Sequence, residues 1–356
     1  MARKKKSISH IEKGQSPVSS LPEIHSLDDV RALLSTLPGP CEQSLSQAEA
    51  REPQLTKPPG SLGRLEEMSH WLATWQARHP ATMDTPRAHV FAGNHGVTGK
   101  GVSAYPAAVT AQMVGNFTNG GAAINQLCKA FGITLAVDAL DLDNPTADFT
   151  EGAAMSEDET VAALSLGMSV VEEACDVLCL GEMGIGNTTS AAAICHALYG
   201  GTATDWTGPG TGVEGAAMSI KIQVVADAVK RHAGGDGLDT LMNLGGRELA
   251  AIVGATLAAR LKRVPVLLDG YVCSAAAAVL EATMPGALDH CQVGHVSSEP
   301  GHIRLLNHLN KTALINFDMR LGEASGAALA VGLLKAAVAC HNGMATFAEA
   351  GVSDKQ

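Results

Sequence analysis

Five short apolar runs, separated by alanine-rich segments, constrain the fold of this chain more than any other feature of its sequence. The runs cover residues 89–92, 133–137, 177–180, 265–268 and 313–317. Each is nearly free of polar residues, as expected of a strand that is buried on both faces of a parallel sheet. Between them, the segments predicted to be helical cover 107–130, 189–199, 215–233, 247–262, 273–283 and 324–340. This alternation predicts an α/β fold with helices flanking a mainly parallel sheet.

Composition indicates how such a fold is packed. Hydrophobic residues make up 46% of the 356 residues, but aromatic residues only 3%, and there are 38 glycines. The core is therefore built mostly from Ala, Val, Leu and Ile, and backbones can approach one another closely. A chain of this length is expected to form one large domain and one small one.

The N-terminal region differs in character from the rest of the chain. Residues 1–24 are polar and rich in serine, and we expect them to form a disordered tail. A helix is predicted to begin after Ser26, and a second to run through 44–51. The Pro/Gly-rich loop 55–65 then leads into a third helix, which carries Trp71 and Trp75.

Charge and cysteine usage exclude several classes of protein. The net charge of −11 argues against a general nucleic-acid surface, and the basic cluster 3–6 is better explained as a solvated tail than as a binding arm. No apolar segment follows that cluster, and no uncharged segment is long enough to span a membrane. The eight cysteines are scattered, with no Cys-x-x-Cys pair, so reduced thiols in a cytoplasmic protein are expected.

Polar side chains follow the ends of the predicted strands. In open α/β sheets, ligands bind at the carboxyl ends of the strands. Polar residues can also simply mark the beginning of a loop, but their repetition favours a ligand-binding edge. The residues concerned are Asn94, His95, Asp138, Asp141, Glu182, Asp269, Asp318 and Glu323.

The loop 181–189 (GEMGIGNTT) lies between a predicted strand and a predicted helix. Glycines allow a ligand to approach the backbone, and the free N–H groups at a helix start suit a phosphate. The loop lacks the lysine of a Walker A motif and is not a complete dinucleotide fingerprint. Phosphate binding is favoured over an ordinary glycine turn capped by threonine.

Two further segments contain candidate ligand-binding residues. The loop 208–212 (GPGTG) precedes the helix that carries Lys221, which is either a partner for the phosphate or a solvated lysine. The segment 294–302 contains His295 and His302. Their spacing matches no usual zinc pattern, and no further ligand motif accompanies them, so no metal site is predicted.

Glu323 lies in the segment 319–327, between a predicted strand and an apolar helix. The helix dipole would stabilise this carboxylate as an anion. If it is partly desolvated, it can instead act as a base near neutral pH. Both interpretations are open from the residue pattern alone.

Taken together, these segments resemble the nicotinate-nucleotide:5,6-dimethylbenzimidazole phosphoribosyltransferase family of cobalamin biosynthesis. The matching stretches occur in the family's order from about residue 27 to the C-terminus. Each is weak alone, but together they are highly specific. Ala324 stands where glycine is common in the family. The stretches are 55–65 (LTKPPGSLGRL), 93–113 (GNHGVTGKGVSAYPAAVTAQM), 119–125 (NGGAAIN), 181–189, 208–213 (GPGTGV), 269–276, 299–302 and 321–327.

The resemblance implies a reaction and a set of site residues. A ring nitrogen of the base would displace nicotinate from C1′ of nicotinate mononucleotide, giving α-ribazole 5′-phosphate, with Glu323 as general base and no cofactor. The nucleotide would be bound by Glu182, Gly184, Gly186, Asn187, Thr188, Gly210, Lys221 and Ser297. The base would be bound by Ser103, Tyr105, Gln112 and Leu321.

The resemblance also implies an architecture. The fold would have a Rossmann-like large domain, over residues 88–323, and a small helical domain made from residues 25–87 and 324–356. Members of the family are homodimers. Dimethylbenzimidazole is the expected base, although related benzimidazoles, purines or phenols are alternatives that pocket shape would decide.

Two other functions compete with this interpretation. A dinucleotide-dependent oxidoreductase would need a complete glycine fingerprint after the first strand, where this chain has 93–96 (GNHG). A non-catalytic nucleotide sensor would bind phosphate but would not need Glu323. Release of nicotinate from nicotinate mononucleotide in the presence of dimethylbenzimidazole distinguishes the enzyme from both.

Overall fold

The computed structural model describes residues 21–172 and 174–353. Its strands are β1 (Pro86–Ala92), β2 (Thr134–Ala139), β3 (Val177–Met183), β4 (Val266–Leu268) and β5 (Cys291–Val293). Its α-helices are α1 (Leu27–Leu34), α2 (Glu42–Arg51), α3 (Arg64–Trp75), α4 (Ala108–Thr118), α5 (Ala123–Phe131), α6 (Glu157–Ser169), α7 (Asn187–Tyr199), α8 (Ala203–Trp206), α9 (Gly215–Arg231), α10 (Gly237–Leu244), α11 (Arg247–Leu261), α12 (Tyr271–Thr283), α13 (Pro300–His308), α14 (Ser325–Gly343) and α15 (Phe347–Ala350). Two short 3-10 helices are η1 (Glu52–Gln54) and η2 (Gly96–Lys100).

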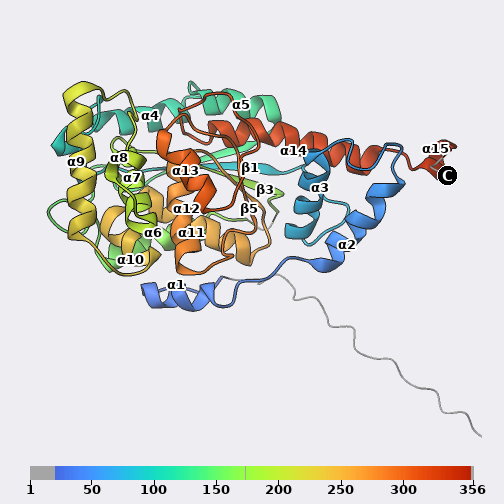
Figure 1. Cartoon of the computed structure of the whole chain (residues 1–356), viewed down its shortest axis with the longest axis horizontal. Coiled ribbons are helices and arrows are strands. Elements are labelled where there is room, and N and C mark those ends of the chain that lie inside the picture. Colours follow the sequence, from blue (N-terminus) through green and yellow to red (C-terminus); the bar gives the residue numbers. More distant parts are fainter. Residues whose placement is uncertain (1–20, 173, 354–356) are drawn as a thin grey trace, which may run out of the picture.

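The five strands form one parallel sheet in the order β2-β1-β3-β4-β5 (Figure 1). The predicted α/β fold with a parallel sheet flanked by helices is therefore confirmed. The strand order changes direction between β1 and β3, which makes this the topological switch point of a doubly wound sheet. Loops that leave the carboxyl ends of β1 and β3 diverge there and leave room for a ligand.

Alternate residues of β3 pack into two separate cores, one on each face of the sheet. Leu178 and Leu180 belong to the core shared with α6, α7, α10, α11 and α12. Val177 and Cys179 belong to the core shared with α3, α5 and α14. In Figure 1, α4, α5 and α14 run above the sheet, whereas α10 and α11 lie below it. Because both faces are covered, the strands need uninterrupted apolar sequence.

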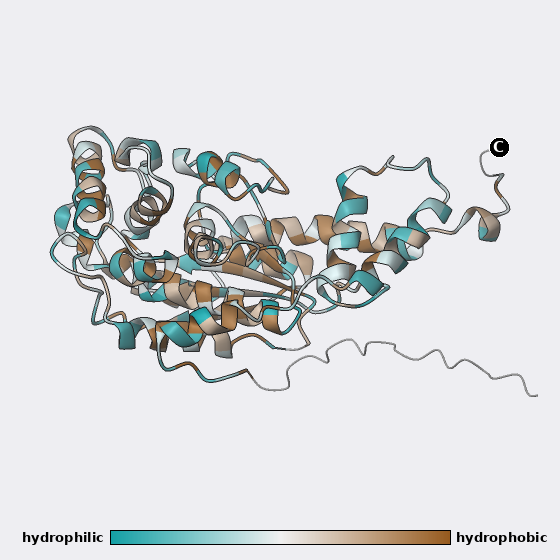
Figure 2. Ribbon diagram, turned by 60° about the horizontal axis from the view of Figure 1, so that its bottom comes forward, coloured by the Kyte–Doolittle hydropathy of each residue, from teal (hydrophilic) through white to brown (hydrophobic). Residues whose placement is uncertain are grey.

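Helix α11 is buried along nearly its whole length, charged residues included. A helix that is apolar all round belongs inside a protein, and Figure 2 shows α11's region as part of the brown interior. It packs closely against α6 because both helices have a glycine at the contact. A Cβ atom at Gly167 would overlap the carbonyl oxygen of Ala251, and one at Gly254 would overlap that of Leu164.

The structure corrects two details of the sequence prediction. The run 313–317 is not a strand: Ile315 makes only a single bridge to His295, and β5 is the shorter segment Cys291–Val293. The apolar run is buried where it begins, at Ala313, but Phe317 is 67% exposed. The helix predicted over 107–130 is two helices, α4 and α5, because Gly120 between them has a left-handed φ of 76°.

The terminal segments pack at different places. Arg31 of α1 forms ion pairs with Asp236 and Asp239 at the start of α10, so α1 lies beneath the large core in Figure 1. Helices α2, α3 and α14 pack together at the other end of the molecule. The predicted division into a large and a small domain stays a prediction. Ile24 is buried, whereas residues 1–20 of the predicted tail lie outside the described residues. Within the described chain, no helix has the length and apolar character to cross a membrane.

Candidate active site

A cavity of about 470 Å³ lies at the carboxyl edge of the sheet, beside the ends of β3, β4 and β5. It brings together loops that are far apart in the sequence. The side chains and backbone that line it come from Tyr105, Glu182, Met183, Gly184, Ile185, Asn187, Thr188, Gly210, Thr211, Gly270, Tyr271, Val272, His295, Ser297, Glu299, Arg320, Leu321 and Gly322.

Most of the residues predicted for the site line this cavity or touch a residue that does. The predicted residues in its lining are Tyr105, Glu182, Gly184, Asn187, Thr188, Gly210, Ser297 and Leu321. Ser103 is hydrogen-bonded to the lining residue Thr211, with 3.1 Å between the hydroxyl oxygens. Glu323 follows the lining residue Gly322 and is buried. Gln112 is exposed on α4 and is not part of the cavity lining.

The polar residues predicted at strand ends do not all converge. Glu182, Asp269 and Glu323 are close enough for their charges to affect one another. Asp138 is instead paired with His89, 2.8 Å from its ring, and His95 is paired with the buried Glu248. Asp141 and Asp318 are exposed. The ligand-binding edge is therefore formed mainly around β3 and β4 rather than along the whole sheet.

The loop 184–188 joins β3 to α7 in a conformation that needs glycine. Gly186 is the N-cap residue of α7 and has a φ of 96°, which side chains disfavour. A Cβ atom there would also lie 2.8 Å from the Thr98 methyl group. The backbone therefore stays close to the cavity, and the start of α7 faces the lining residues Asn187 and Thr188.

Lys221 joins the two glycine loops. Its ammonium group donates hydrogen bonds to Thr188 Oγ1, at 2.8 Å, and to the carbonyl oxygen of Gly208, at 2.9 Å. It is almost fully buried, so it is not the solvated lysine that the sequence left as an alternative. Burial lowers the pKa of Lys221 to about 8, and the nearby Glu299 opposes that shift. A bound anion would favour its charged form.

Glu299 is a cavity residue to which sequence reasoning assigned no role. Its Oε1 accepts a hydrogen bond from the backbone N–H of Gly210, at 2.8 Å. Its Oε2 has no hydrogen-bond partner within the described residues. Burial raises the pKa of this carboxyl group. A free carboxylate oxygen in a cavity is suited to accept a hydrogen bond from a ligand hydroxyl. The only sequence signal was its place in the stretch 299–302.

Three buried carboxyl groups lie at the inner end of the site. Burial raises the pKa of Glu182 to about 8, although the hydrogen bond from Asn187 lowers it. Burial also raises the pKa of Asp269 to about 7. For Glu323, burial and the neighbouring Asp269 raise the pKa to about 7. A carboxyl group with a pKa near neutrality can both accept and release a proton under physiological conditions.

The backbone at Glu323 is strained. Glu323 and Ala324 both have left-handed φ angles, of 63° and 62°. Non-glycine residues in this conformation are uncommon and concentrate at functional sites. The angle at Ala324 also explains physically why a glycine would suit that position.

The histidines of the segment 294–302 do not form a metal site in the described structure. His302 accepts a hydrogen bond from the Ser297 N–H at Nδ1, and its Nε2 lies 3.1 Å from the Ser274 hydroxyl. Both of its ring nitrogens are therefore engaged. His295 Nε2 lies 3.8 Å from Asp269 Oδ1 and faces the cavity.

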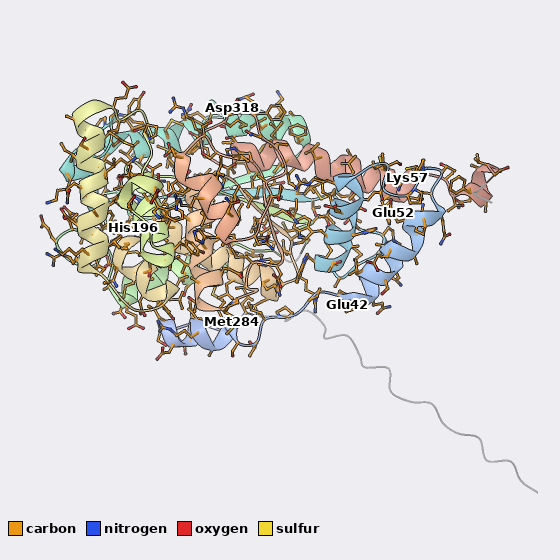
Figure 3. The ribbon with its side chains drawn as sticks, viewed as in Figure 1. Glu42, Glu52, Lys57, His196, Met284 and Asp318 are labelled. Carbon is orange, nitrogen blue, oxygen red and sulfur yellow. The ribbon has the colours of Figure 1, made fainter. Side chains whose placement is uncertain are left out.

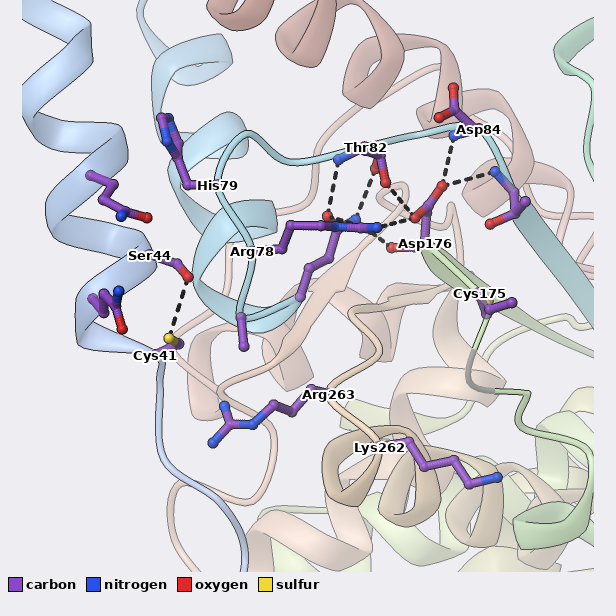
Figure 4. Close-up of a pocket in the computed structure, with 16 residues that line it drawn as sticks. Cys41, Ser44, Arg78, His79, Thr82, Asp84, Cys175, Asp176, Lys262 and Arg263 are labelled. Atoms are coloured by element: carbon purple, nitrogen blue, oxygen red, sulfur yellow. Dashed lines mark hydrogen bonds and ion pairs between the residues drawn. The ribbon is translucent and has the colours of Figure 1, made fainter. Parts of the chain in front are cut away.

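A larger cavity, of about 910 Å³, lies between α2, the segment before β1 and the end of α11 (Figure 4). Its central carboxylate, Asp176, accepts hydrogen bonds from Arg78, from the Thr82 hydroxyl and from backbone N–H groups. Burial alone would raise the pKa of Asp176, but these bonds hold it below its usual value. This carboxylate is thus fully engaged in structure, and the smaller cavity is the better candidate for chemistry.

A family model described as phosphoribosyltransferase matches residues 37–352. The chain belongs to this phosphoribosyltransferase family. It is 57% identical to the nicotinate-nucleotide–dimethylbenzimidazole phosphoribosyltransferase of Rhizobium leguminosarum bv. trifolii (strain WSM2304), over 95% of this chain and 99% of that protein. It is 58% identical to the protein of the same name from Sinorhizobium medicae (strain WSM419), over 92% and 97%. A crystal structure of CobT from Thermus thermophilus has a TM-score of 0.82 and 40% identity, covering 88% of this chain and all of that one (100%).

In this phosphoribosyltransferase, the sequence missed cavity residues that lack a motif of their own. Arg320 lines the cavity and donates a hydrogen bond to the carbonyl oxygen of Gly210, at 3.2 Å. Tyr271 also lines it, while its hydroxyl donates to the carbonyl oxygen of Trp206, at 2.9 Å. Both follow directly on segments that the sequence did single out. Their positions after β4 and before Glu323 were the available signal.

Proposed function

We propose that this chain transfers the 5-phosphoribosyl group of nicotinate mononucleotide to 5,6-dimethylbenzimidazole, giving α-ribazole 5′-phosphate and nicotinate. This is a step in the synthesis of the lower ligand of cobalamin. The observation that carries the proposal is one cavity that joins two glycine loops and a buried lysine to a buried carboxyl group with a pKa of about 7. The relatives named for this reaction support it.

The chemistry needs few protein groups. A ring nitrogen of the base attacks C1′ as the bond from C1′ to the nicotinate nitrogen breaks. The leaving pyridinium takes the bonding electrons and becomes neutral nicotinate nitrogen. The attacking base becomes cationic and loses the proton on its other ring nitrogen. One carboxylate can take up that proton and also stabilise the cation.

We assign the proton-accepting role to Glu323. Its raised pKa is matched to transfer near neutral pH. Glu182 has a pKa of about 8, so it stays largely protonated at pH 7 and can donate a hydrogen bond. These two carboxyl groups would therefore do different things at the same pH.

The phosphate would serve as a remote handle whose binding energy orients C1′. We assign it to the loop 184–188, with Gly210, Lys221 and Ser297 nearby. Glu299 is suited to a ribose hydroxyl, because its Oε2 has no other partner among the described residues. For the base we retain Tyr105 and Leu321, which line the cavity, and Ser103, with Gln112 further out on α4.

We also propose a homodimer in the cytoplasm. The homodimer follows from the family resemblance. The cytoplasmic location is supported by the cysteines, all of which are free thiols in the structure. Thiols stay reduced in a reducing compartment.

The decisive experiment is to incubate the purified protein with nicotinate mononucleotide and dimethylbenzimidazole and to follow both products by liquid chromatography. Nicotinate and α-ribazole 5′-phosphate should appear in equal amounts. Release of nicotinate without the base would indicate a hydrolase. Binding of the nucleotide with no release would indicate a sensor.

Chelation is expected to leave turnover unchanged. Departure of a cationic pyridinium neutralises a charge and needs no Lewis acid. Prolonged EDTA treatment should therefore leave kcat at 25 °C within the error of the assay. A loss of kcat that zinc or magnesium restores would contradict this mechanism.

Replacing Gly186 by Ala should mainly weaken nucleotide binding. The added methyl group would disfavour the left-handed φ and press on Thr98, moving the loop away from the phosphate. A strain of about 1 kcal/mol corresponds to a roughly 5-fold higher KM for nicotinate mononucleotide. Gly132→Ala is the matched control, because Gly132 also has a positive φ but meets only a lysine tip at 3.6 Å. Equal KM values for the two variants would show that the loop is only a turn.

A further inference from the structure

A second cluster of titratable side chains lies at the far end of α14. It consists of Glu52 in η1, His70 in α3 and His341 near the end of α14. In Figure 3, Glu52 and Lys57 lie at the end of the molecule formed by α2, α3 and α14. None of the three cluster residues lines the cavity assigned to the reaction.

The geometry of this cluster is that of a compact ligand set. Its three candidate ligand atoms lie within 4.8 Å of one another. Glu52 Oε2 lies 2.6 Å from His341 Nδ1 and 3.7 Å from His70 Nε2. Glu52 and His341 are buried, whereas His70 is partly exposed and gives access from solvent. His70 Nε2 is buried and has no hydrogen-bond partner in the described chain.

Neighbouring groups hold these side chains in place. Lys57 Nζ lies 2.7 Å from Glu52 Oε1, which leaves Oε2 directed at the two rings. His79 Nε2 lies 3.1 Å from His341 Nε2. If His341 binds an ion through Nδ1, its Nε2–H can donate to His79, as the second ring nitrogen of a metal-bound histidine does. Each ligand would thus be oriented by a further partner.

The local charge also accommodates a cation. Lys57 is shared between two carboxylates, because Glu66 Oε1 lies 2.7 Å from the same ammonium group. The guanidinium of Arg51 is occupied by the carbonyl oxygens of His341, Asn342 and Met344. With neutral histidines, the two carboxylates and one lysine leave a net negative charge. Burial lowers the pKa of His341, which keeps its ring neutral and its lone pair available.

We propose that Glu52, His70 and His341 bind a Zn²⁺ ion that fastens the end of α14 to η1 and α3. Two imidazoles and one carboxylate, with a fourth position left for water, form a set that zinc accepts and that magnesium and calcium do not prefer. The ligands are up to 289 positions apart in the sequence. The unfolded chain would not hold such a site, so zinc binding would stabilise the folded state.

The test compares the full-length protein with His70→Gln, after EDTA treatment and dialysis into metal-free buffer. Bound zinc is measured by mass spectrometry after re-loading with ZnCl₂ and gel filtration, and Tm is measured with and without the metal. The wild-type chain should retain one zinc per chain. At a hundredfold excess of zinc over Kd, its Tm should rise by roughly 3–8 °C. His70→Gln should retain little zinc and show little rise.

The matched control is His25→Gln, because the His25 side chain is 79% exposed. It should bind zinc as the wild-type chain does. If His70→Gln retains as much zinc as the wild-type chain, or if neither retains any, the proposal is wrong. The cluster would then be a hydrogen-bond network in which His341 donates to Glu52. A site that binds only Ni²⁺ or Cu²⁺ would also overturn the assignment of zinc. Because kcat at 25 °C is measured separately, failure here leaves the proposed reaction untouched.

Discussion

Replacing Glu323 by Gln is expected to lower kcat by about 10²–10⁴-fold, the usual contribution of a general base. Glutamine keeps the shape of the side chain and a hydrogen-bonding carbonyl, but it does not take up the proton of the base. The KM for nicotinate mononucleotide should change little, because the phosphate is assigned to other residues. If Glu323 served only as an acid at a helix start, its loss would instead cost about 0.3–1 kcal/mol of stability and little activity.

The pH dependence gives an independent measure of the same role. Glu323 acts as a base only when it is ionised, and burial with the nearby Asp269 raises its pKa to about 7. Activity of the wild-type enzyme should therefore rise with pH through an apparent pKa near 7 and level off above it. This rise should disappear in Glu323→Gln.

The matched control for Glu323→Gln is Glu151→Gln, since the Glu151 side chain is 73% exposed. It should retain wild-type kcat and pH profile. Steady-state kinetics and thermal melting of both variants are the required measurements. A near-normal kcat for Glu323→Gln would remove this residue from the chemistry, and the proton would have to leave through another group or through water.

The sequence predicted those parts of the fold that depend on long apolar patterns. The runs around β1, β3 and β4 were found because a strand covered on both faces cannot contain polar residues. Helix α11 was found because it is buried on all sides. Strand β5 was missed, since three residues with a glutamine in the middle carry no pattern. The amphipathic helices α6, α10 and α13 were also missed, because their polar faces interrupt the apolar signal.

The site was predicted to the extent that its residues lie in loops joined to those elements. Glu182 and Lys221 belong to glycine loops whose backbone geometry restricts the sequence. Glu299 and Arg320 enter the cavity through tertiary packing, and neither has a spacing that marks it. The cluster of Glu52, His70 and His341 shows the same limit more strongly. Its members come from three elements, so no local motif connects them.

Replacing Lys221 by Gln is expected to raise the KM for nicotinate mononucleotide by roughly 10–100-fold, with a smaller effect on kcat. A hydrogen bond to a charged group contributes about 1.5–3 kcal/mol, and about 1.4 kcal/mol corresponds to a factor of ten. Lys221 also holds the two glycine loops together through Thr188 and Gly208. Its loss should therefore remove both a positive charge and the support of the loop assigned to the phosphate.

The pH dependence of KM distinguishes the charge from the support. Burial lowers the pKa of Lys221 to about 8, so the free enzyme loses this charge as the pH rises through that value. The KM of the wild-type enzyme for the nucleotide should then increase above pH 8, and in Lys221→Gln it should stay flat. The matched control is Lys230→Gln, an exposed lysine on the same helix α9, which should leave KM unchanged. If KM in Lys221→Gln matches that of Lys230→Gln while Tm falls, Lys221 has a structural role only, and the phosphate must be bound by backbone N–H groups without it.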